Sequence, residues 1–68
     1  MYVLTITENN TIKYFSMLSF NGIYTDADIH KSVIFSTANL ANNQRTILNT
    51  IDSTRTFTVK QITLADVN

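Results

Sequence analysis

The residues best suited to chemistry in this chain are one histidine and two nearby carboxylates. His30 follows Asp26 and Asp28 in a short polar segment that we interpret as a loop or a single helical turn. A metal site needs three or four ligands, and the segment lacks the ligand spacing of a calcium-binding loop. An acid–base pair would need burial to raise the pKa of one carboxyl, and the neighbouring residues do not predict burial. We therefore interpret the carboxylates as capping groups and His30 as a solvated loop residue, and we predict no metal site.

Other catalytic arrangements are equally difficult to build from these residues. The chain has no cysteine, one glycine and one histidine. It therefore has no thiol nucleophile, no disulfide and no glycine-rich loop that could hold phosphate groups. Its serines and threonines lack the G-x-S-x-G motif that presents a nucleophile. We expect a protein that is not an enzyme, with no catalytic residue and no cofactor.

The length and charge of the chain limit its organisation further. Sixty-eight residues form one domain, 1–68, with room for one small core. Five Lys and Arg residues balance five Asp and Glu residues, so no net field would attract a polyanion. The first residues lack a basic leader, and no apolar run approaches the roughly 20 residues of a membrane span. These features predict a cytoplasmic protein without a membrane partner.

Alternating apolar residues predict an antiparallel hairpin at the start of the chain, with strands at 2–7 and 11–20. A two-residue turn at Asn9-Asn10 would place Ile6 opposite Lys13 and mix apolar and polar residues on one face. We therefore predict a three-residue loop that pairs Ile6 with Ile12 and directs Tyr2, Leu4, Ile6, Ile12, Tyr14, Leu18 and Phe20 to one face.

Turn and capping residues predict the elements that follow. Asn21-Gly22 is typical of a type I′ turn, so we expect a third strand at Ile23-Tyr24 and a fourth at 32–35. Ser36 or Thr37 is suited to start a helix that ends at Asp52-Ser53-Thr54. Its predicted dry face comprises Leu40, Ala41, Gln44, Ile47, Leu48 and Ile51.

The C-terminal part is predicted to complete the sheet. Residues 55–64 alternate in a strand pattern that changes parity, which a bulge near Lys60-Gln61 would correct, and 65–68 is expected to be a loose tail. The predicted fold class is α+β, a small antiparallel sheet in the order β-β-β-β-α-β with one helix packed on one face.

The predicted register leaves large apolar side chains on the face away from the helix. These are Met1, Val3, Phe15 and Met17. One interpretation is an exposed patch that binds a protein partner, most simply a second copy in a homodimer. The other is that a terminal segment or the 25–31 loop folds over these side chains.

An alternative function follows from Lys13 and Phe15 on one strand. A basic residue beside an exposed aromatic ring is typical of single-stranded nucleic-acid binding. The remaining basic residues are scattered along the chain, whereas phosphate contacts usually need a basic stripe. We keep a weak single-stranded nucleic-acid-binding module as the second hypothesis.

The order of hydrophobic segments also resembles that of small accessory proteins encoded by phages and prophages of low-GC Gram-positive bacteria. The resemblance lies in Tyr2-Val3-Leu4, in Val33-Ile34-Phe35-Ser36-Thr37 before a helix that ends Ile47-Leu48-Asn49-Thr50-Ile51, and in the closing strand Val59 to Leu64. It implies a protein of a bacterial host's cytoplasm that acts by binding, for example as an inhibitor of a host or defence enzyme, as small anti-CRISPR proteins do. It assigns no functional residue.

Overall fold

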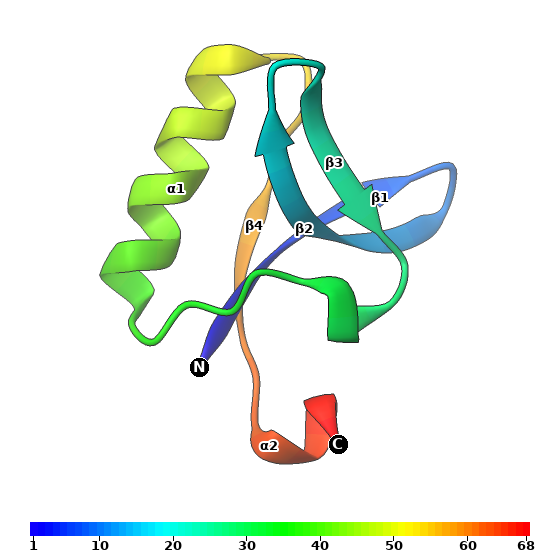
Figure 1. The fold of residues 1–68 in the computed structure, drawn as a ribbon, viewed down its shortest axis with the longest axis vertical. Helices are drawn as coiled ribbons and strands as arrows, with labels where there is room; N and C mark the ends of the chain where they lie inside the picture. Colours follow the sequence, from blue (N-terminus) through cyan, green and yellow to red (C-terminus); the bar gives the residue numbers. More distant parts are fainter.

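A four-stranded antiparallel sheet carries one long helix on one face (Figure 1). The computed structural model describes all residues, 1–68. The strands are β1 (Tyr2–Glu8), β2 (Thr11–Ser19), β3 (Gly22–Asp26) and β4 (Thr58–Gln61), in the spatial order β3-β2-β1-β4. The helices are α1 (Ala38–Ile51), the short 3-10 helix η1 (Ile29–Lys31) and the single turn α2 (Leu64–Val67). The predicted α+β class, with a helix packed on one face of a small antiparallel sheet, is confirmed.

The first hairpin has the register of a two-residue turn, so the predicted three-residue loop is wrong. Ile6 lies opposite Lys13, and Thr7 lies opposite Ile12, so the turn contains only Asn9 and Asn10. Both asparagines have positive φ, at 53° and 64°, as a type I′ turn requires. Such a turn matches the twist of the two strands, and asparagine tolerates the left-handed conformation. The local turn geometry therefore set the register, and Ile12 remains exposed as a consequence.

The second hairpin forms one residue earlier than predicted. Ser19 pairs with Gly22, so the turn residues are Phe20 and Asn21. Gly22 is the residue with positive φ, at 121°, and it opens β3 instead of sitting inside the turn. A bulge at Ser16, between the pairs of Phe15 and Met17, bends β2. As a result β2 pairs with β1 along its first half and with β3 along its second half.

Residues 32–35 form less sheet structure than predicted. Phe35 makes an isolated antiparallel bridge with Tyr2, and Val33 donates a backbone hydrogen bond to the Phe15 carbonyl. This stretch lies beside the sheet without becoming a strand. The predicted loose tail contains a helical turn instead, because Asp66 accepts hydrogen bonds from the backbone N–H and the hydroxyl of Thr63 in a capping box.

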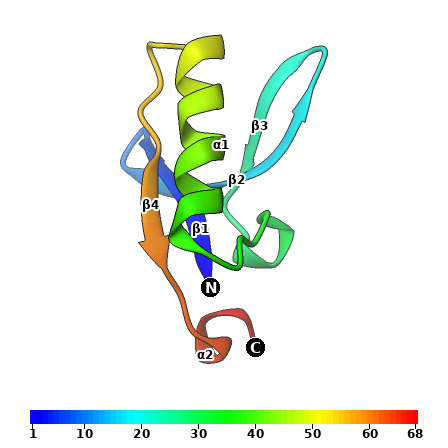
Figure 2. The same ribbon diagram turned by 90° about the vertical axis from the view of Figure 1, so that its left-hand side faces the viewer.

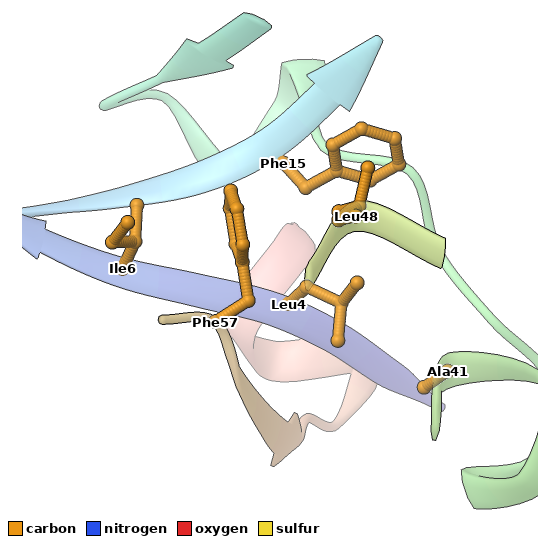
Figure 3. Packing of buried hydrophobic residues seen from close by; sticks show 6 residues of the cluster. All are labelled: Leu4, Ile6, Phe15, Ala41, Leu48 and Phe57. Atoms are coloured by element: carbon orange, nitrogen blue, oxygen red, sulfur yellow. The ribbon is translucent and has the colours of Figure 1, made fainter. Parts of the chain in front are cut away.

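Helix α1 has the predicted ends. The hydroxyl of Thr37 accepts a hydrogen bond from the backbone N–H of Leu40 at 3.2 Å, and Asp52 is the C-terminal cap. The helix packs mainly on β1 and β4. Its buried residues, Ala41 and Leu48, meet Leu4, Ile6, Phe15 and Phe57 in one core cluster (Figure 3).

Candidate interaction surface

The four residues predicted to form an exposed patch do not share a surface. Val3 and Phe15 are buried, whereas Met1 and Met17 are exposed. With the observed register, Phe15 lies on the same face as Leu4 and Ile6, toward α1, and packs in the main core. Val3 points to the opposite face of the sheet from its neighbour Leu4, and it is buried there. The assignment of these four side chains to one solvent-facing patch was wrong for two reasons: Phe15 was placed on the other face by the three-residue loop, and Val3 lies on the predicted face but is buried there.

Burial of Phe15 also changes the proposed nucleic-acid site. Stacking on a base requires an exposed ring face, and Phe15 is 4% exposed, with Phe57 edge-on to it at a centroid distance of 6.3 Å. Lys13 lies beside Ile6 on the helix side of the sheet. The structure therefore does not form a stacking platform from Lys13 and Phe15.

The polar segment at 26–31 is built around caps, as predicted. The carboxylate of Asp28 accepts hydrogen bonds from the His30 backbone N–H and lies 2.9 Å from His30 Nδ1. The His30 backbone N–H lowers the pKa of Asp28, and the Asp28 side chain raises the pKa of His30. Asp26 in turn accepts a hydrogen bond from the backbone N–H of Asp28 at 2.8 Å. Both partners of the Asp28–His30 pair are well exposed, so the pair fixes η1 at the surface.

The largest departure from the predicted surface lies on α1. The predicted dry face of the helix is only partly covered by the sheet, because only Ala41 and Leu48 are buried. Leu40, Ile47 and Ile51 are 51%, 49% and 52% exposed. Together with the half-buried Gln44 they form a line along the helix that we call the α1 stripe.

The α1 stripe faces the part of the sheet that the helix leaves uncovered. At about 100° per residue, its three apolar members lie about 60–100° from Leu48 around the helix axis, all on one side. The right-handed sense of the helix directs that side toward β2 and β3, which stand beside α1 in Figure 2. On these strands the pair Leu18–Ile23 lies on the same face as Phe15. Apolar side chains of the helix and of the second hairpin therefore lie on the same side of the sheet.

The tip of the second hairpin carries further exposed apolar side chains. Leu18, Ser19 and Phe20 line a shallow depression that is largely open to solvent. Phe20 is fully exposed, and Leu18 is partly exposed. We call these three residues the hairpin tip.

A partly buried ion pair holds the second hairpin in place beside the helix. Arg55, which follows α1, contacts Glu8 at 3.3 Å and donates a hydrogen bond to the Ile23 carbonyl at 3.1 Å. Its guanidinium lies 5.6 Å from the centre of the Phe57 ring. The same Glu8 carboxylate accepts a hydrogen bond from the Thr25 hydroxyl. These contacts join β1, β3 and the segment after α1.

Sequence reasoning named the residues of the α1 stripe but missed their exposure. The spacing contained a usable signal, because Leu40, Gln44, Ile47 and Ile51 follow one another at intervals of four, three and four. This is the a/d spacing of a helix that packs against another helix. Ala41 and Leu48 provide a second, narrower line that is sufficient to contact the sheet.

Comparisons with protein-family models, curated proteins and solved structures found no match for this chain. None of its helices combines the length and the apolar character needed to cross a bilayer. Its His, Asp and Glu side chains nowhere gather in a group of three or more that could hold a metal ion.

Proposed function

We propose that this protein is a non-enzymatic interaction module that binds a protein partner through the α1 stripe and the hairpin tip. The observation that carries the proposal is the exposure of Leu40, Ile47 and Ile51 on a helix that buries only Ala41 and Leu48 against the sheet. Large apolar side chains gathered on one side of a small domain are typical of a binding surface.

The composition of this surface supports a protein partner over a nucleic acid. The α1 stripe and the hairpin tip contain no charged residue, and the only charged residue of α1 is Arg45. Arg45 lies on the opposite side of the helix, where it donates a hydrogen bond to Asn42 at 3.1 Å. Nucleic-acid binding draws most of its affinity from cationic contacts with phosphate. An apolar surface without cations instead favours burial against another protein.

Affinity capture from a lysate of the source organism tests the proposal. Three baits are compared: the native chain, Ile47→Glu, and Asn49→Glu as a matched control on the other side of α1. We expect the native and Asn49→Glu baits to retain one or more proteins, the chain itself included. The amount of each should be at least tenfold lower on Ile47→Glu. Both variants must keep the native far-UV circular dichroism spectrum. The same set of retained proteins on all three baits would show that the α1 stripe is not the binding surface.

A further inference from the structure

We infer that the partner of the α1 stripe is the α1 stripe of a second copy, in a parallel, two-fold symmetric helix pair. This inference rests on the proposed function, because it identifies an occupant for the same surface. Two observations support it: the α1 stripe has the residue spacing of a helix–helix contact, and it lies beside a part of the sheet that α1 does not cover.

The pattern on α1 specifies a helix as the neighbouring element. Leu40 and Ile47 occupy d positions, and Gln44 and Ile51 occupy a positions, of a heptad repeat. The same line is half-exposed in the structure, whereas the residues that follow Leu40 and Ile47, Ala41 and Leu48, are already packed on the sheet. Side chains at a and d pack as knobs into the holes of a facing helix, so a second helix is the element that this spacing fits.

The width of the sheet leaves space for one more helix. Four strands about 4.8 Å apart form a layer that two helices about 10 Å apart would cover. Helix α1 covers mainly β1 and β4. The part of the sheet that α1 leaves uncovered is the tip half of the β2–β3 hairpin, around the exposed Leu18, on the side to which the α1 stripe is directed (Figure 2).

The charge distribution selects a second copy as the source of that helix. The residues that flank the α1 stripe away from the sheet are Asn43 and Thr50, which carry no charge. A basic or acidic helix would find no opposite charge here, whereas a second copy brings an identical neutral stripe and no repulsion. The outer face of α1 is compatible with an apolar neighbour as well, because the hydroxyls of Thr46 and Thr50 donate to carbonyls of their own helix, at 3.0 and 2.9 Å. Their methyl groups are then available to contact the hairpin tip of the other copy.

The direction of the helices follows from Gln44 and from the second hairpin. In a parallel pair Gln44 faces its own copy, and the two amides can hydrogen-bond to each other, as polar residues at a single a position do. In an antiparallel pair Gln44 would face Ile47 and lose such a partner. In the parallel pair, a two-fold axis along the helices places the two sheets on opposite sides of the helix pair. In an antiparallel pair, both sheets would lie on the same side of the helix pair, and the two β2–β3 hairpins would collide.

The area available is consistent with a weak dimer. Each half-exposed Leu or Ile leaves roughly 50 Å² of apolar surface, and the exposed Phe20 adds about 150–250 Å². The apolar surface thus amounts to roughly 300–400 Å² per copy. With an apolar share of about 65%, two copies would bury a total of about 900–1,200 Å², at or below the lower end of specific interfaces. We therefore expect dissociation in the micromolar range.

Single cysteine variants test both the pairing and its direction, since the chain has no native cysteine. A parallel pair brings residue 40 next to residue 40 and residue 51 next to residue 51. Leu40→Cys and Ile51→Cys should each form a disulfide-linked dimer alone on mild oxidation, and Asn49→Cys should form no disulfide-linked dimer. In an antiparallel pair, residues 40 of the two copies are about 16 Å apart, beyond disulfide reach, and only a mixture of the two variants would cross-link.

Sedimentation equilibrium of the chain without cysteines provides the second measurement. We expect a monomer–dimer equilibrium whose association constant falls at least tenfold in Ile47→Glu and is unchanged in Asn49→Glu. A monomer at all concentrations, or cross-linking confined to the mixture, would overturn the inference. If the chain is monomeric while Ile47→Glu still abolishes capture of another protein, the proposed function stands and the second copy is the wrong partner.

Discussion

Replacing Phe15 with alanine should remove most of the stability of this domain. The Phe15 ring is buried between the sheet and α1, 4% exposed, and packs edge-to-face against Phe57 with an interplanar angle of 80°. In Figure 3 it lies close to Leu48 of α1, so it connects β2 to the helix. Its loss would open a cavity at the centre of the core.

The expected cost follows from that burial. Truncation of a buried phenylalanine to alanine destabilises by about 3–5 kcal/mol, including the lost transfer free energy and the cavity. The contribution of the ring pair with Phe57 is about 0.5–1.5 kcal/mol and falls within this range. A core of this size supplies about 3–5 kcal/mol in total. Phe15→Ala should therefore be largely unfolded at 25 °C, whereas Phe15→Leu should lose about 1–2 kcal/mol.

Urea unfolding followed by far-UV circular dichroism measures these differences at one protein concentration. Ile12→Ala is the matched control, because Ile12 lies on the same strand but is 55% exposed. It should cost less than about 1 kcal/mol. The three-residue loop would bury Ile12 and expose Phe15, and it predicts the opposite order of destabilisation. If Ile12→Ala were the more destabilised variant, the register and the core described above would be refuted.

Three further perturbations test local features. Gly22→Ala should cost about 1–2 kcal/mol from backbone strain alone, since φ is 121° and an added Cβ meets no atom within 4 Å; urea unfolding no different from native would exclude this turn geometry. Thr37→Ala should lower stability by about 1 kcal/mol through loss of the helix cap, and an unchanged free energy of unfolding would contradict the cap. The Asp28 carboxylate raises the pKa of His30, so the imidazole proton resonance should titrate with a midpoint above 6.5 that falls in Asp28→Asn. The pair stabilises the fold fully at pH values above the titration of Asp28 and below the unfolded pKa of His30. This stabilisation is lost as pH rises through the native pKa of His30. An unchanged midpoint in Asp28→Asn would contradict the pairing.

The ends of the elements could be predicted from the sequence where a local interaction decides them. Thr37 starts α1 because its hydroxyl reaches the N–H of Leu40, three residues away. Asn9-Asn10 carried the signal of a tight turn as well, since asparagine accepts positive φ. The turn preference of these asparagines proved stronger than the preference for an unmixed apolar face. The chain tolerates the mixed face by leaving Ile12 exposed.

The candidate interaction surface depended on information that local patterns do not contain. The apolar residues of α1 span a wide arc, and the sequence alone does not state how much of it the sheet can cover. That share was decided by the position of α1 over β1 and β4 and by the bulge at Ser16 that bends β2.

The sequence by itself thus determined the α+β class, the helix ends and the absence of thiol chemistry, because capping, alternation and composition act over a few residues. Only the tertiary structure decided that Phe15 is core and that Leu40, Ile47 and Ile51 are surface. A one-residue change of register exchanges the two faces of a strand, and burial depends on neighbours that are distant in the chain.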